Sequence, residues 1–95
     1  STDYQRAAAI STLTGNAPVA LSLEIAAGVA TLLEQTFSPS IGKVVIDAVV
    51  VDEAAKRFTN RSGVPLPLVL EATERYIKPA AESARNQMDR MIEEQ

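Results

Sequence analysis

The stretch VVIDAVVVDEAAKRF, from Val44 to Phe58, decides the fold. It joins a β-branched run around Asp47 to an alanine-rich, charged segment typical of a helix. Valine and isoleucine favour strands, but no turn signal separates the run from DEAAKRF, and Ser38-Pro39 before it has the pattern of a helix start. No other segment offers a strand to pair with it. We therefore predict a helix that ends near Arg61, although residues 44–51 taken alone also fit a strand.

As a helix, this segment has two apolar faces on a helical wheel. The first face consists of Ile41, Val44, Ala48, Val51, Ala55 and Phe58. The second consists of Ile46, Val49 and Val50, beside a strip made of Lys43, Asp47, Ala54 and Arg61. One neighbouring layer of helices can cover the first face, so the second face predicts contact with another helix or another subunit.

A second expected helix, from about Pro18 to Thr36, is apolar around nearly its whole circumference. Its few polar positions form one narrow stripe of Glu24, Gly28, Thr31 and Gln35. A helix of this kind lies at the centre of a fold or of an assembly.

The flanking segments complete the helical prediction. The first helix should end near Thr14, before Gly15-Asn16, with Ala7, Ile10, Leu13 and the neighbouring alanines as its apolar positions. A fourth helix should begin near Leu66, and Pro79 should kink or divide it. Its expected inward positions are Leu66, Leu70, Thr73, Ile77, Ala80 and Ala84. Residues 82–95 read as an amphipathic tail helix with Met88, Met91 and Ile92 on one face.

Composition agrees with an all-α, compact bundle of four to five helices in a single domain, residues 1–95. The 95 residues suit one domain, and 46% of them are hydrophobic but only 4% aromatic, so the core must consist of Ala, Val, Leu and Ile. The chain contains no cysteine and no histidine, which removes thiolate metal ligands and the commonest general base. We expect no enzyme, no cofactor and no metal site.

Several short patterns point to chemistry but have simpler explanations. Ser40 and Lys43 match S-x-x-K, yet the companion motifs of the serine enzymes that use it are missing. Glu24 and Asp47 could act as a buried acid and base, but solvent-edge positions explain both, with Asp47 paired to Lys43. Asn60 begins an N-x-S triplet that short sequences often contain by chance.

The best functional hypothesis is a non-enzymatic protein–protein interaction or assembly subunit that self-associates. The expected partner-binding residues are Ile46, Val49, Val50, Met88, Met91 and Ile92. One alternative is a nucleic-acid-binding regulator that uses Lys56, Arg57 and Arg61, but the net charge of −3 does not favour it. Another alternative is a small-ligand carrier with an apolar pocket. The N-terminus has no signal pattern and no apolar stretch reaches spanning length, so we expect a cytoplasmic protein without a membrane span.

Overall fold

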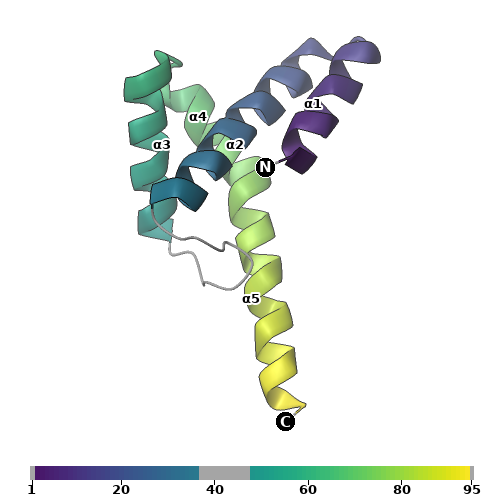
Figure 1. Cartoon of the computed structure of the whole chain (residues 1–95), viewed down its shortest axis with the longest axis vertical. Helices are drawn as coiled ribbons and strands as arrows, with labels where there is room; N and C mark the ends of the chain where they lie inside the picture. The colour runs from purple at the N-terminus through teal and green to yellow at the C-terminus, as the bar shows by residue number, and fades with distance from the viewer. Residues whose placement is uncertain (1, 37–47, 95) are drawn as a thin grey trace.

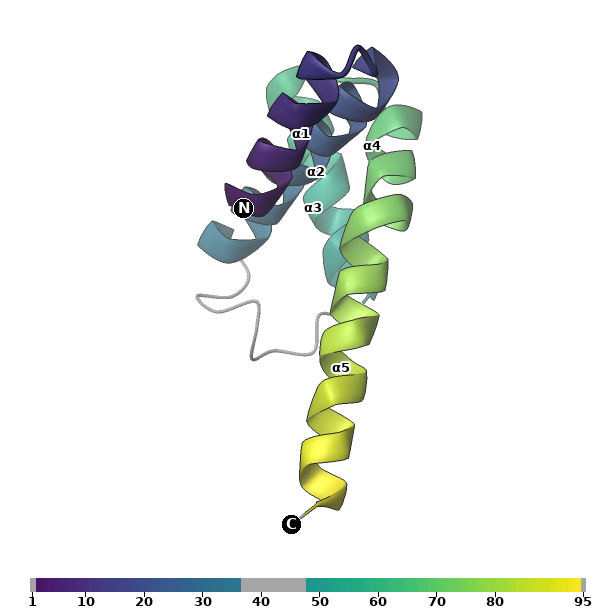
Figure 2. The same cartoon turned by 90° about the vertical axis from the view of Figure 1, so that its right-hand side faces the viewer.

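The computed structural model describes residues 2–36 and 48–94, and their regular structure is entirely helical (Figures 1 and 2). The elements are α1 (Thr2–Leu13), α2 (Ala17–Thr36), α3 (Ala48–Ser62), α4 (Leu66–Ala72), the π-helical turn η1 (Thr73–Ile77) and α5 (Lys78–Glu93). The all-α class is confirmed. The last three elements follow one another without a break, so α4, η1 and α5 form one long rod.

Helix α2 is the centre of the fold, as its nearly all-round hydrophobicity predicts. It contacts α1, α3, α4 and η1. Its buried residues are Ala20, Leu23, Ile25, Ala26, Ala27, Val29, Ala30, Leu32 and Leu33. The many alanines let neighbouring helices approach closely, and α3 and the rod complete the core with Val51, Ala54, Ala55, Val69, Ala72 and Ile77.

A tight turn folds α1 back on α2. Gly15 adopts a positive φ of 79°, its amide donates to the Thr12 carbonyl at 3.1 Å, and the Asn16 amide donates to the Ser11 carbonyl at 2.8 Å. This pair of bonds is the Schellman motif, which needs a left-handed residue that glycine supplies without strain. Helix α2 starts directly afterwards with Pro18 in its first turn, as predicted.

The buried face of α1 agrees with the predicted one at the alanines but not at its two large aliphatic residues. Ile10 is 61% exposed and Leu13 is 86% exposed, whereas Ala8 is buried and Tyr4 is half-buried. The reason is a tertiary contact: the Tyr4 hydroxyl donates to the Tyr76 carbonyl at 3.1 Å, and the two rings lie 6.2 Å apart. This contact turns the Tyr4–Ala8 side of α1 toward the body and leaves the larger aliphatic residues in solvent.

Helix α3 confirms that Ala48–Val51 is helical, while residues 44–47 lie outside the described part of the chain. Val51 and Ala55 of the first predicted face are buried, and Phe58 is half-buried against the core. Ala54 was assigned to the strip beside the second face, and this was wrong, because it is 0% exposed. Ala54 lies one turn from Val51 and four residues before Phe58, so it belongs to the same buried stripe.

Candidate functional site

Helix α5 leaves the body of the fold, which consists of α1, α2, α3, α4 and η1. In both views its C-terminal half extends away from α1, α2, α3 and α4 (Figures 1 and 2). Among the described residues, η1 is the element with which α5 makes substantial contact, and none of the residues of α5 is buried. The described chain is accordingly elongated, 46 × 30 × 20 Å.

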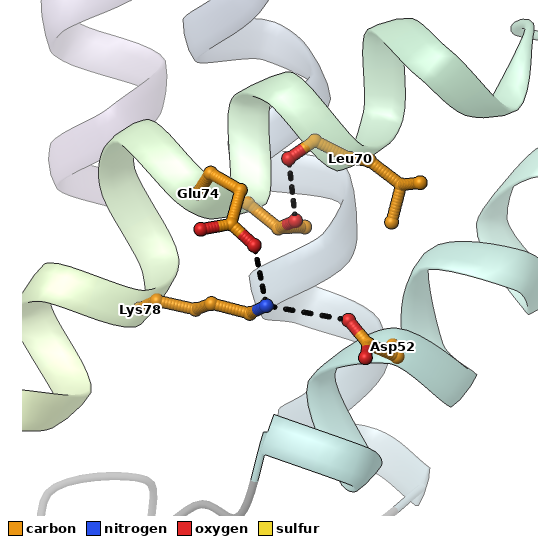
Figure 3. A network of polar contacts seen from close by, with 5 residues as sticks. Asp52, Leu70, Glu74 and Lys78 are labelled. Carbon is orange, nitrogen blue, oxygen red and sulfur yellow. Dashed lines mark hydrogen bonds and ion pairs between the residues drawn. The ribbon is translucent and has the colours of Figure 1, made fainter.

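Lys78 lies where α5 leaves the body, and Figure 3 shows its contacts with Glu74 and Asp52. Its ammonium group lies 2.5 Å from a Glu74 carboxylate oxygen and 3.5 Å from an Asp52 oxygen on α3. The hydrogen bond to Glu74 is the main cause that raises the pKa of Lys78; partial burial lowers it, and the charge of Asp52 raises it further. The lysine therefore links the first turn of α5 to α3 and to the preceding turn of its own rod.

A π turn allows the rod to continue through Pro79. Proline lacks an amide hydrogen, and in a regular helix its ring clashes with the carbonyl four residues earlier. Here the Lys78 amide donates to the Thr73 carbonyl, five residues earlier, so the turn before Pro79 contains one extra residue. Pro79 was predicted to kink or divide the helix; instead the rod continues without a break through Pro79, and the irregular turn η1 lies just before it, at Thr73–Ile77.

The extra residue shifts the apolar stripe of the rod. The predicted inward positions Thr73 and Ile77 are buried, and Leu70 is half-buried against the core. The next predicted position, Ala80, is exposed, while Ala81 is half-buried. A regular helical period placed Ala80 inward, and the one-residue insertion explains why Ala81 takes that side instead.

Beyond the body, the same stripe continues along α5 at spacings of three, four and three residues. Its members are Ala81, Ala84, Met88 and Met91, with Ile92 beside the last. Met91 is 64% exposed and Ile92 is 65% exposed. These three-and-four spacings are those of helices that pair along their length.

The predicted partner-binding residues fall into three groups. Ile46 lies outside the described residues. Val50 is partly buried against the core of its own domain, whereas Val49 is 61% exposed. Met88, Met91 and Ile92 lie together on the projecting helix, and Figure 1 shows that α3 and the end of α5 lie in different parts of the molecule. The structure therefore does not bring the five described residues into one patch.

An open groove of about 540 Å³ lies between α1, α2 and α3. Its lining comprises Gln5, Glu24, Ala27, Gly28, Thr31, Leu32, Gln35, Phe58, Arg61 and Ser62. The polar stripe of α2 thus faces this groove. At Gly28 the Phe58 ring occupies the space that a Cβ would need, so glycine is required for this close approach.

A smaller hollow of about 180 Å³ lies between the start of α2 and the rod. Leu21 and Leu68, which are 48% and 42% exposed, both line it. The Ser22 hydroxyl is also in its lining and has no hydrogen-bond partner among the described residues. This is a second place where aliphatic side chains meet solvent.

The remaining sequence candidates that the structure describes do not form a reactive site. Ser40, Lys43 and Asp47 lie outside the described residues, so an Asp47–Glu24 pair has no description. Lys56, Arg57 and Arg61 are all exposed on α3, as is Asn60. In the part of the chain that the structure describes, no three acidic side chains come together as metal ligands could.

Within the described part of the chain, the helical segment Ala17–Gln35 has the length and apolar composition that a membrane span requires, contrary to the expectation that no apolar stretch reaches this length. Half of it is buried inside the fold, and the core helix of a globular domain has the same properties.

Sequence reasoning missed the contacts that hold α1 and the rod in place. Tyr4 was not singled out, although an isolated aromatic residue in a chain that is only 4% aromatic is itself a signal of a specific contact. Lys78 was not singled out either, because its partner Asp52 is distant in sequence. Phe58 was expected to face inward, but nothing in the sequence connects it to Gly28.

Comparisons with known proteins add no relative: no protein-family model, curated protein or solved structure matches the chain.

Proposed function

We propose that this chain is a non-enzymatic assembly subunit, a helical domain that associates with further copies of itself through apolar surface outside its core. The observation that carries the proposal is α5, a helix that projects from the body with an apolar stripe ending in Met88, Met91 and Ile92. Isolated helices of this length are marginal in water, so a projecting helix gains stability when its apolar side packs against a partner. Contiguous exposed apolar residues commonly mark interaction sites.

The division of the chain into a body and a projecting helix supports the same proposal. The body has a core of its own, which includes residues without solvent exposure such as Val29, Val69 and Ala72. It does not need α5 to complete this core, because no residue of α5 is buried. The apolar side chains of α5 are therefore available to another molecule without disrupting the domain.

The test is the molecular mass in solution across protein concentration. Light scattering coupled to gel filtration, or sedimentation velocity, should show association between about 1 and 300 μM. A single pair of helices forms a small interface, and small interfaces are typical of weak complexes. Met91→Glu, which puts a charge on the apolar stripe, should abolish the association. Asn86→Glu, which puts the same charge on the exposed side of α5, is the matched control and should leave it unchanged. A monomeric mass at the highest concentration would overturn the proposal.

The groove between α1, α2 and α3 favours a second function, the binding of a small amphipathic ligand. Its volume falls within the range of about 300–1,000 Å³ that is common for ligand pockets. Its lining contains the apolar side chains of Leu32 and Phe58 and the oppositely charged Glu24 and Arg61. Titration with the amphipathic anion 1-anilinonaphthalene-8-sulfonate, followed by amide chemical shifts, tests it. Shift changes confined to the groove and lost in Arg61→Glu would support a carrier, whereas changes spread over the surface would contradict it.

A further inference from the structure

The size pattern of the α5 stripe specifies its partner. The two positions nearest the body, Ala81 and Ala84, are small, and the two positions nearest the tip, Met88 and Met91, are large. A second α5 in the same direction would place small opposite small and large opposite large. A second α5 in the opposite direction would place each methionine opposite an alanine.

We propose that two copies of this chain pair through antiparallel α5 helices, with Ala81 opposite Met91 of the other copy and Ala84 opposite Met88 of the other copy. This inference rests on the proposed function and gives it a geometry. In this register every layer holds one small and one large side chain, which fills the space between helices evenly. The pairing is also two-fold symmetric, because each copy uses the same surface. It therefore closes after two copies and does not grow into a filament.

The pairing surface continues an interface that already exists within the chain. Thr73 and Ile77 are buried against the body, and Leu70 packs against the core. After the one-residue shift at η1, the same side of the rod carries the stripe beyond the body, where no other described element makes substantial contact with α5. Within the body α2 and α3 cover the apolar side of the rod, and beyond the body the partner helix would cover it.

The charged residues beside the stripe are compatible with this pairing. Arg85 of both copies would lie near the centre of the pair, which is unfavourable by itself. Each Arg85 has Glu82 three residues before it and Asp89 four residues after it on its own helix, at spacings that favour ion pairs. The edge of the pair therefore carries both signs of charge.

Disulfide cross-linking decides the direction, because the chain has no cysteine and every cross-link reports an introduced one. The variants are Ala81→Cys and Met91→Cys, one of them carrying an affinity tag, oxidised separately and as a mixture of full-length chains. In the antiparallel register, residue 81 lies opposite residue 91 of the other copy, while the two residues 81 are about 15 Å apart along the axis. Disulfides need Cα atoms roughly 4.4–6.8 Å apart, so only the mixture should form a cross-linked dimer.

Each other result overturns the inference. Cross-linking of the separate variants would mean parallel helices. Association without cross-links in any sample would mean that another surface mediates it, in which case the proposed function stands and the α5 pairing fails. A monomer at all concentrations would contradict both the α5 pairing and the proposed function. Circular dichroism of the reduced variants checks that they are folded, as expected for positions outside the core.

A size swap gives a second measurement that does not depend on oxidation. Met88→Ala leaves two alanines in each central layer, and Ala84→Met leaves two methionines, so each should weaken dimerisation by about tenfold. The double variant Ala84→Met/Met88→Ala restores one small and one large residue per layer, and its dissociation constant should return to within about threefold of the original. A double variant as weak as the sum of the single variants would contradict the register.

Discussion

The two halves of the rod share one apolar stripe but meet different surroundings. In α4 and η1 the stripe is buried by α2 and α3, and Ile77 is 5% exposed. In α5 it continues with the same kind of spacing, yet Met91 is 64% exposed. A stripe in the sequence therefore shows which side of a helix is apolar, but the arrangement of the neighbouring helices determines where that side is covered.

The largest expected difference between the halves is in stability. Ile77→Ala should lower the free energy of unfolding by about 2–5 kcal/mol, because it leaves a cavity in the core. Met91→Ala should change it by no more than about 0.5 kcal/mol at concentrations where the chain is monomeric. Urea unfolding followed by circular dichroism measures both. Equal losses would mean that the two halves are equally buried, contrary to the structure.

A second prediction concerns the close approach of α2 and α3 within the body. Gly28→Ala should lower the free energy of unfolding by about 1 kcal/mol, because the new methyl group meets the Phe58 ring and this cost exceeds the gain in helix propensity. In a Phe58→Ala background the same substitution should instead stabilise by about 0.5–1 kcal/mol. The same sign in both backgrounds would show that the ring does not rest on Gly28.

The ion pairs of Lys78, at the junction between the two halves of the rod, should contribute less to the free energy of unfolding. Lys78→Gln should lower the free energy of unfolding by at most about 1 kcal/mol, because its carboxylate partners Asp52 and Glu74 are about half exposed or more and solvent weakens such pairs. Asp52→Asn made alone and together with Lys78→Gln completes a double-mutant cycle. A coupling energy of zero between positions 52 and 78 would exclude a contribution of the 3.5 Å contact to stability.

The smallest expected effect is on titration at high pH. Burial, followed by the nearby charge of Asp3, raises the pKa of Tyr4 above its usual value of 10.0. A group whose pKa is higher in the folded state stabilises the fold below its unfolded pKa and loses this contribution as pH rises through the folded pKa. Stability should therefore fall above about pH 10.

Tyrosinate absorbance tests this directly. In Tyr76→Phe the remaining phenol belongs to Tyr4, because the chain has two tyrosines, and the carbonyl that accepts its hydrogen bond is retained. Its midpoint in the folded protein should exceed the midpoint in urea. Equal midpoints would contradict the half-buried position of Tyr4.

Local patterns predicted several helix boundaries, although the predicted helix start at Ser38-Pro39 lies outside the described residues and α5 begins at Lys78, earlier than the predicted tail helix of residues 82–95. Gly15, Pro18 and Leu66 mark boundaries that the structure confirms, because capping and proline geometry act over a few residues. The central position of α2 followed from its composition. The stripe shift at Ala81 was not predictable from a regular period, since a π turn depends on how the backbone accommodates Pro79.

The candidate site was predictable only in part. Met88, Met91 and Ile92 were recognised as one apolar side of a tail helix, and this side is exposed on α5 at Met91 and Ile92. Val50 was grouped with them because a wheel cannot show which neighbours a helix will have. The groove at Gly28 and Phe58 depends on the crossing of two helices, and no local pattern in the sequence carries that information.

The contact between Tyr4 and Tyr76 has a consequence for the order of folding. It joins residues 72 positions apart, whereas α1 and α2 meet through a turn of a few residues. Closing a long chain segment loses more entropy than closing a short turn, so we expect the α1–α2 hairpin to form early and its attachment to the rod to form late. Removing the hydroxyl with Tyr4→Phe should then accelerate unfolding and leave the refolding rate nearly unchanged.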